Sequence, residues 1–560
     1  MNVTKISRLG YTLRHLKVTQ LSTFIVRRGL PAAKVSAVPT CVLRECMHGQ
    51  PLLPVTTLRN SESDFEFLHS VETVNDSVIN WNPSEQSRLW RYHLHYFDML
   101  RDPDRSSENK QWLIEDWIQS NPQGSEPAWE PYTASLRIVN WIGFFLCAET
   151  EIPVNWLNSL YEQVLWLEKN DERHILANHY FENIKSWLFA GLYFSGSDAD
   201  RWLQKSQKLL AQQLDEQFLT DGGHYERSPH YHALMIENVL DLYNLASANS
   251  MLVDDSLIRQ LKQVAVNGLS LLDQILYPGD QLPLFNDSAK ETEQRLADIF
   301  NYGEQLVGFK RAAVIDRARL IDFPETGLYG VRSGNHALMI DCGDIGPAYQ
   351  PGHTHCDFLS YELILDGQPV VVDSGLFEYQ GGVMRNYVRS TSAHNTVVVG
   401  GHEQSEVWGE FRVARRAKKC SAVASLDSGD QFRFEGLVSG FPTIRCGVKH
   451  QRTVSADIAS PNLLITIDDE IHLSGSHHLE SYIHLHPDIE LEAESGHSYK
   501  LMRDGQYICH ITMDKKLEVR TEEGWYCPSF GLRYRNPVIV AAIDSNVSRN
   551  LAYRFERRTL

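Results

Sequence analysis

The sequence lacks several features that mark other classes of protein. No stretch of its 560 residues reaches the ~20 apolar residues that a membrane-spanning helix needs. The nine cysteines are scattered and form no Cys-x-x-Cys pair, which argues against a cysteine-rich zinc site and a disulfide framework and favours a reducing compartment. The net charge of −18 argues against nucleic acid as a partner, so any polyanion site must be a local basic or neutral patch.

The N-terminal segment has the opposite charge from the rest of the chain. Residues 1–44 contain eight Lys or Arg and no Asp or Glu. Their apolar runs are short and no small-residue cleavage site follows them, so a secretory signal is weakly supported and we expect a cytoplasmic or cell-envelope-associated protein. The segment could form a basic surface helix in weak contact with anionic lipid, or a poorly ordered lead.

Hydrophobic periodicity predicts a multidomain α and β protein. Residues 1–85 form the basic segment and lead-in. Within 86–322, apolar residues recur at spacings of three and four, which predicts successive helical hairpins, stacked or closed in a ring. Within 323–560, β-rich runs dominate, and Asp366-Gly367 between two such runs predicts a hairpin. An antiparallel β-sandwich is the natural fold for this second half.

Two polar clusters lie in the helical half. One contains Asn178, His179 and Glu182, whose spacing places them on one face of a helix. These polar residues could serve a functional site, or Asn178 could simply cap the helix. The segment 224–232 holds three histidines and two tyrosines in nine residues. Helix initiation by Ser228-Pro229 explains only part of that composition, so a functional role is favoured.

A third cluster lies in the β-rich half. His353 and His355 alternate along an extended segment and therefore point to the same side. With Asp373 and His394 they form a plausible set of zinc ligands. A hydrogen-bonded polar cluster at the end of a sheet would explain the same residues.

Taken together, these clusters resemble the heparinase II/III family of polysaccharide lyases and, in architecture, oligoalginate lyases. The resemblance covers about residues 90–420 and is carried by LHYFDML (94–100), EPYTASLRIVNW (130–141), NHYFEN (178–183), DGGHYERSPHYH (221–232), GHTHCDFLSYEL (352–363) and RNYVRSTSAHNTV (385–397). It implies an N-terminal incomplete α/α toroid followed by a C-terminal antiparallel β-sandwich, which agrees with the periodicity.

The resemblance also implies roles for single residues. Tyr231 matches the catalytic tyrosine and His353 the catalytic histidine, while Asn178 or His179 matches the group that neutralises the uronate carboxylate. Four further residues are expected to bind substrate, namely Glu182, Arg227, His230 and Arg389. Three are expected to hold one zinc ion, in a structural rather than a catalytic role, namely His355, Asp373 and His394.

These residue types suit β-elimination from an acidic, glycosaminoglycan-like or alginate-like polysaccharide by a carbon–oxygen lyase. Asn178 and His179 would stabilise the enolate-like oxygens that develop as the C5 proton leaves. Tyr231 could act as the acid, or as the base if a cation such as Arg227 favoured its phenolate, with His353 as the base for the opposite C5 epimer. The route, the glycan, endo or exo action and the oligomeric state stay open.

Two other functions are compatible with the sequence. One is a carbohydrate-processing or glycan-binding protein of bacterial envelope or capsular polysaccharide assembly, without lyase activity. The other is a zinc-dependent glycoside hydrolase, which ranks last because paired carboxylates at a recognisable spacing are not evident.

Overall fold

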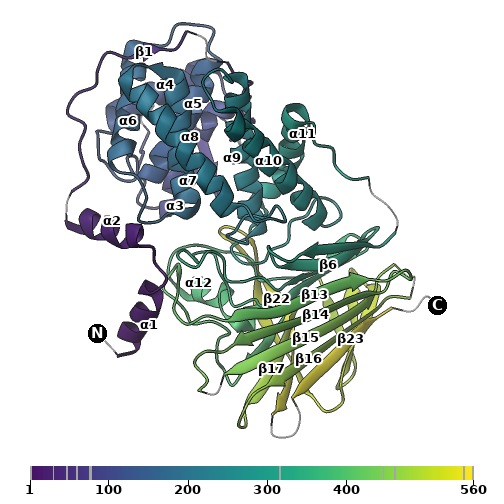
Figure 1. Cartoon of the computed structure of the whole chain (residues 1–560). Helices are drawn as coiled ribbons and strands as arrows, with labels where there is room; N and C mark the ends of the chain where they lie inside the picture. Colours follow the sequence, from purple (N-terminus) through teal and green to yellow (C-terminus); the bar gives the residue numbers. More distant parts are fainter. Residues whose placement is uncertain are drawn as a thin grey trace.

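The structure is a computed structural model, shown in Figure 1. It describes residues 3–29, 31–45, 48–57, 61–74, 79–313, 317–445, 447–459, 462–545 and 549–557. Cys46 and Cys446 lie outside these ranges, and the other seven cysteines are free thiols, as their scattered spacing predicts.

The helical half is an incomplete α/α toroid, as predicted. Its helices are α3 (Arg88–Tyr96), α4 (Ser107–Ser120), α5 (Pro131–Leu146), α6 (Val154–Lys169), α7 (Ala177–Tyr193), α8 (Ser197–Gln217), α9 (Pro229–Ala248), α10 (Asp255–Ile275) and α11 (Leu296–Val307), with the short 3-10 helices η1 (Asp98–Arg101) and η2 (Lys290–Arg295). Helix α7 lies at the centre, packed between α5, α8 and α9. Nearly all of its residues are buried, including polar ones such as Asn178 and Glu182, so the polar side chains of this helix stand inside the protein rather than on its surface.

The start of α9 shows how local sequence positions the site. Ser228 caps the helix by accepting a hydrogen bond from the Tyr231 backbone amide, and Pro229 occupies the first turn, where its missing amide hydrogen costs nothing. The predicted helix start is therefore present. Because the cap fixes the first turn, Tyr231 projects from a rigid end of the helix.

The second half is an antiparallel β-sandwich, as predicted. The first sheet follows chain order through β5 (Arg319–Phe323), β6 (Leu328–Ser333), β7 (His336–Asp341), β8 (Tyr361–Leu365) and β9 (Gln368–Val371). The turn between β8 and β9 is the predicted Asp366-Gly367 hairpin, with φ values of 53° and 77° that favour these two residue types.

Two further sheets, of eight and four strands, complete this half. The eight-stranded sheet has the order β13 (Lys418–Leu426), β14 (Phe432–Gly440), β15 (Val448–Asp457), β16 (Leu464–His472), β23 (Asn550–Glu556), β20 (Gln506–Met513), β19 (Ser498–Arg503) and β18 (Glu490–Ser495). The four-stranded sheet has the order β10 (Val397–Val399), β17 (His478–His484), β22 (Leu532–Asp544) and β21 (Glu518–Ser529). Between these strands lie α12 (Val383–Val388), η3 (Thr391–Ala393) and a small hairpin of β11 (Val407–Trp408) and β12 (Arg412–Val413).

The two halves have separate apolar cores. The first is formed by residues between 53 and 307, together with Tyr349, and the second by residues between 318 and 555. Helix α11 ends at Val307 and β5 begins at Arg319, so the predicted boundary between residues 322 and 323 falls inside β5. We propose that the boundary between the toroid and the sandwich lies in the connection before β5.

The basic N-terminal segment is helical. It forms α1 (Val3–Leu13) and α2 (Val18–Gly29), which lie on one flank of the molecule beside the junction of the two halves (Figure 1). The lead-in also contributes the hairpin β2 (Asp64–Phe67) and β3 (Ser70–Thr73), and β1 (Val42–Leu43), which pairs with β4 (Phe194–Ser195). No helix in the described part of the chain combines the length and the apolar character needed to cross a membrane.

Candidate active site

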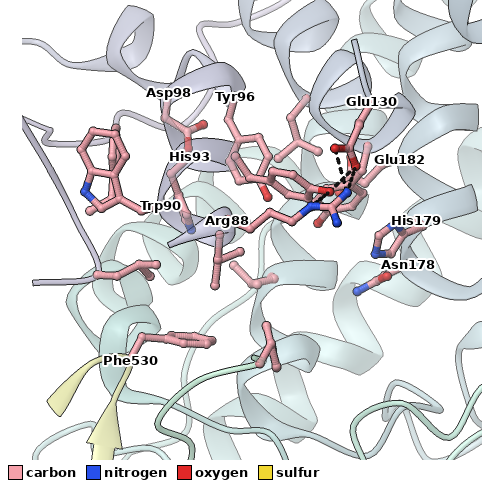
Figure 2. A pocket seen from close by; sticks show the side chains of 18 of the residues that line it. Arg88, Trp90, His93, Tyr96, Asp98, Glu130, Asn178, His179, Glu182 and Phe530 are labelled. Carbon is pink, nitrogen blue, oxygen red and sulfur yellow. Dashed lines mark hydrogen bonds and ion pairs between the residues drawn. The ribbon is translucent and has the colours of Figure 1, made fainter. Parts of the chain in front are cut away.

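A cleft of about 1300 Å³ lies between the toroid and the sandwich and is lined by residues of both. Helices α3, α5, α7 and α9 form one wall, and loops around residues 377–380, 410–411 and 530–531 form the other. Figure 2 shows Asn178, His179 and Glu182 on the helical side and Phe530 on the opposite side of this space. The cleft is therefore a site that neither half could form alone.

Tyr231 and His353, which are far apart in the sequence, meet in this cleft. Their rings stack with centroids 3.9 Å apart and planes 29° apart. Tyr231 projects from α9, whereas His353 comes from the loop before β8. On its other side, the Tyr231 hydroxyl forms a hydrogen bond of 2.6 Å with the hydroxyl of Tyr379.

Asp287 fixes the orientation of His353. One Asp287 oxygen lies 2.9 Å from His353 Nδ1, and the carboxylate is also bound by the guanidinium of the fully buried Arg385. Burial alone would raise the pKa of Asp287, but Arg385 and hydrogen bonds from His353 and His355 hold it well below the ordinary value. Because the Asp287 carboxylate accepts a hydrogen bond from Nδ1–H, the other ring nitrogen, Nε2, points away from Asp287 and lies 3.8 Å from a Glu226 oxygen.

Tyr231 is a neutral phenol in this setting. Burial raises its pKa well above 10, and the neighbouring Tyr379, Asp287 and Glu226 raise it further. The guanidinium of the buried Arg385 is engaged by the Asp287 carboxylate and does not offset these effects. The environment therefore suits a proton donor rather than a ready-made base.

Asn178 and His179 occupy the first turn of α7 and line the cleft (Figure 2). The His179 side chain is 32% exposed and its Nδ1 lies 3.0 Å from Glu172. Burial alone would lower the pKa of His179, but the charge and hydrogen bond of Glu172 raise it above the usual value. The deeper Glu182 is hydrogen-bonded by Asn238, and burial raises its pKa.

Two predicted substrate-binding residues lie elsewhere. Arg227 is outside the cleft lining, and its guanidinium donates to the carbonyls of Glu325 and Thr326 at 2.6 and 2.9 Å. Arg389 is 1% exposed and donates to main-chain carbonyls that include Thr354 O at 3.1 Å. Both guanidinium groups hold loops together, so the prediction that they contact substrate is corrected.

His230 does line the cleft, but its ring is already engaged. Its Nδ1 lies 3.1 Å from the Ala289 carbonyl and 2.5 Å from the Thr292 hydroxyl. Burial lowers its pKa to about 4, so it is neutral over the physiological range. It can shape the cleft without adding a charge to it.

The predicted metal ligands form a second, sealed cluster. The donor atoms of His355, Asp373 and His394 lie within 4.8 Å of one another, and all three residues are fully buried. Among the residues that the structure describes, none is a hydrogen-bond partner of His355 Nδ1 or His394 Nε2, which leaves two buried ring nitrogens for an ion. This buried His–Asp–His group could bind a metal.

Comparison with known families agrees with this arrangement. The model described as the heparinase II/III N-terminus matches residues 61–314, and the model described as heparinase II/III-like, C-terminal, matches residues 315–552. The chain belongs to the heparinase II/III family.

Curated relatives of this heparinase II/III chain are distant in sequence. A heparin-sulfate lyase of Pedobacter heparinus is 25% identical over 363 residues, which are 58% of this chain and 52% of the relative. A heparin-sulfate lyase of Bacteroides thetaiotaomicron is 23% identical over 61% of this chain and 56% of the relative. The aligned part thus spans about half the length of these relatives. FtsZ-localized protein C of Caulobacter vibrioides is also similar, with 22% identity over 48% of this chain and 45% of the relative.

Solved structures share the fold. The crystal structure of heparinase III superimposes with a TM-score of 0.64 at 17% identity, over 86% of this chain and 79% of that one. Heparan sulfate lyase HepC from Pedobacter heparinus gives a TM-score of 0.57 at 19% identity, over 88% of this chain and 81% of that one. At these identities the likeness concerns the architecture of toroid and sandwich alone.

Three residues of the cleft cluster were missed by the sequence analysis. Asp287 and Tyr379 each stand in a loop segment without a histidine or a recognisable motif, so nothing local distinguishes them from ordinary loop residues. Arg385 lies in the segment 385–397 used for the family resemblance, but its role depends on its contact with Asp287, which is distant in sequence. Only the fold brings these groups together.

Proposed function

We propose that this chain is a polysaccharide lyase that cleaves the C4–O bond of a 4-linked uronate by β-elimination. The observation that carries the proposal is the stacked pair of Tyr231 and His353 in a cleft lined by both domains, with His353 oriented by Asp287. Membership of the heparinase II/III family supports it.

The first step is removal of the C5 proton. His179, as an imidazolium, and the Asn178 amide would bind the uronate carboxylate and stabilise the negative charge that develops on its oxygens. His353 Nε2 then takes the C5 proton, while Asp287 stabilises the resulting imidazolium. The electron pair of the C–H bond forms the C4–C5 double bond.

The second step is departure of the glycosidic oxygen. The C4–O bond breaks and the neutral Tyr231 phenol donates its proton to that oxygen. The proton held by His353 afterwards returns to Tyr231, which restores both groups. Because the two rings stack against each other, acid and base approach the same face of the sugar, which favours syn elimination. Uronates whose C5 hydrogen and C4 oxygen share a face, such as D-glucuronate, are the matching substrates.

The charge of the cleft favours an unsulfated glycan. Its lining contains ten carboxylate residues and five cationic ones, namely Arg27, Arg88, Arg101, Lys185 and Arg295. Each of these cations already binds an internal acceptor; Arg101 and Arg295, for example, share Glu237. A sulfate entering the cleft would have to break one of these contacts, and an unpaired buried anion is costly. The relatives' name, heparin-sulfate lyase, makes the unsulfated heparan backbone the first substrate to test.

We further propose that His355, Asp373 and His394 hold one zinc ion with a structural role. When bound, the ion would supply a fixed positive charge that ties together the segments carrying these ligands. None of the three lines the cleft, so a glycan bound there does not meet them. That separation supports elimination over a zinc-dependent hydrolysis.

The test of the lyase proposal is the chemistry of the product. Purified protein is incubated with heparosan, hyaluronan, alginate and bacterial capsular glycans, and ultraviolet absorbance and product mass are followed. Elimination gives an unsaturated uronate that absorbs and is lighter by one water than a hydrolysis product. Absence of an unsaturated product from every glycan would reject the proposal and favour a glycan-binding role in envelope polysaccharide assembly.

The predicted weak membrane contact is retained as a proposal, for α2 alone. Phe24, Ile25 and Val26 are more than half exposed there, next to the exposed Arg28. An apolar patch with an adjacent cation suits an anionic membrane surface, in the cytoplasm or the cell envelope. Co-sedimentation with anionic vesicles, but not with zwitterionic ones, is the expected result, and Phe24→Ser should abolish it.

A further inference from the structure

The N-terminal segment before residue 36 lies outside both family matches, which together cover residues 61–552. The proposed mechanism does not use it. Figure 1 shows α1 beside the sandwich and α2 beside the toroid, on one flank of the junction between them. The segment thus crosses from one half of the molecule to the other beside the cleft.

Helix α1 is fastened to the β11–β12 hairpin of the sandwich. Arg8 Nε lies 2.9 Å from Glu406, and the Trp408 indole donates to the Thr12 hydroxyl at 3.1 Å. The turn of this hairpin carries Glu410 and Phe411, which line the cleft. One end of the segment therefore holds a part of the sandwich wall.

Helix α2 and the residues after it are fastened to the toroid wall. The Arg27 guanidinium donates to the carbonyls of Asn170 and Asp171, and the Ala33 amide donates to the Asn170 side chain at 3.0 Å. Asn170 lines the cleft, as do Arg27 and Ala32 themselves. The segment is thus part of the wall at this end of the cleft.

Gln20 joins the two halves directly. This side chain is 3% exposed, and its amide nitrogen lies 3.3 Å from both the Ile175 carbonyl of the toroid and the Tyr349 carbonyl in the loop between β7 and β8. Lys17 is paired with Glu216 and lies over the Tyr349 ring at 4.0 Å. A buried amide shared by two domains resists their separation, because opening would leave its polar atoms without partners.

We infer that residues 5–29 and 31–35, here called the strap, tie the two walls together and close one end of the cleft, so that the glycan enters by its chain end and is cleaved from there. A cleft open at both ends would admit the middle of a polymer, whereas a cleft blocked at one end admits only a terminus. The strap is thus a specificity-determining element for exo action. This inference rests on the proposed lyase function.

The experiment compares the wild-type chain with the double variant Gln20→Ala/Arg27→Ala, which removes the amide shared by the two halves and the Arg27 contacts to the toroid wall. Arg28→Ala is the matched control, because Arg28 neighbours Arg27, is exposed and lies over the ring of Phe24 in the same helix. Viscosity and product length are followed on a long unsulfated glycan. The wild type and Arg28→Ala should release short products while viscosity falls slowly. The double variant should release severalfold longer early products with a rapid fall in viscosity.

A second readout does not depend on activity. Hydrogen exchange of the backbone at residues 170–176 and at the Tyr349 loop, residues 347–351, should become severalfold faster in the double variant than in Arg28→Ala, because these segments lose the contacts of Gln20 and Arg27. Unchanged exchange, or long early products from the wild type, would overturn the inference. If no glycan yields an unsaturated product, the lyase proposal fails, and the exchange measurement still decides whether the strap ties the walls.

Discussion

Two clusters of imidazole and carboxylate groups meet at Asp287, and they differ in their access to solvent. One Asp287 oxygen binds His353, whose side chain is 14% exposed and stacks on Tyr231 in the cleft. The other binds His355, which is fully buried and belongs to the His–Asp–His group. The same residue types therefore stand on both sides of one carboxylate, in an open and a sealed setting.

Because the residue types are the same, solvent access is what distinguishes the chemistry open to each cluster. The open cluster offers a neutral phenol and an imidazole nitrogen to a substrate that can enter. The sealed cluster offers unpaired ring nitrogens that no glycan can reach. We therefore expect loss of chemistry from changes in the first, loss of stability from changes in the second, and both from changes in Asp287.

Tyr231→Phe should have the largest effect on turnover. It removes the proton donor and keeps the ring stacked on His353, so kcat should fall about 10²–10⁴-fold, the usual contribution of general acid catalysis. Ultraviolet detection of unsaturated product gives kcat, and circular dichroism verifies the fold. Tyr379→Phe is the matched control and should lose far less. A Tyr231→Phe enzyme within a few-fold of the wild type would contradict the assignment.

Asp287→Asn should affect both clusters. It leaves the buried Arg385 without its carboxylate partner, which costs about 3–5 kcal/mol for a broken buried ion pair. It also releases the orientation of His353. Urea unfolding should therefore show lower stability, and kcat should fall at temperatures where the variant is still folded. Loss of activity with unchanged stability would indicate that the two clusters are independent.

Removal of the metal should affect the stability provided by the sealed cluster and leave the chemistry of the open cluster intact. With ion content measured by elemental analysis, a chelator should lower the Tm of the wild type by several degrees and leave kcat nearly unchanged below that temperature. His394→Ala should bind no ion and be insensitive to the chelator. Immediate loss of activity on chelation, restored by zinc without a change in Tm, would instead assign the metal a catalytic role.

The pH profile tests the role of His179 in the open cluster. Glu172 overrides the effect of burial and raises the pKa of His179, so the imidazolium is present at low pH and is lost as pH rises through that raised value. The value of kcat/KM should fall along the same alkaline limb. Glu172→Gln removes the raising charge and should move this limb to lower pH. A limb that does not move would exclude His179 as the titrating group.

The smallest effect is expected at the rim of the cleft. Glu130 accepts two hydrogen bonds of 2.8 Å from Arg88, which is 59% exposed (Figure 2). Glu130→Gln should free this guanidinium and raise kcat/KM for a sulfated glycan severalfold relative to its unsulfated counterpart. Glu126→Gln, which removes a cleft carboxylate without releasing an arginine, should leave the ratio unchanged. Equal ratios in both variants would show that Arg88 is not masked by Glu130.

The sequence predicted the fold class because periodicity and turn chemistry are local properties. The change from helical to β-rich spacing and the Asp366-Gly367 hairpin are both present in the structure. The order of strands in the three sheets and the course of the strap could not be predicted, because they depend on pairings between distant segments.

Only some of the residues that meet in the cleft could be singled out from the sequence. Tyr231 and His353 stand in segments dense in polar residues, so the sequence singled them out. Asp287 and Tyr379 stand alone in loops and gain their roles only from contacts formed by the fold. Arg227 and Arg389 also stand in polar segments, but their guanidinium groups bind main-chain carbonyls instead of facing the cleft. A polar segment therefore does not show by itself which of its side chains reach the site.

The most direct test of the central claim is product analysis of the wild type and Tyr231→Phe on heparosan, by ultraviolet absorbance and mass spectrometry together. The account predicts an unsaturated uronate from the wild type and almost none from the folded variant. Saturated products from the wild type, or undiminished unsaturated product from Tyr231→Phe, would contradict it.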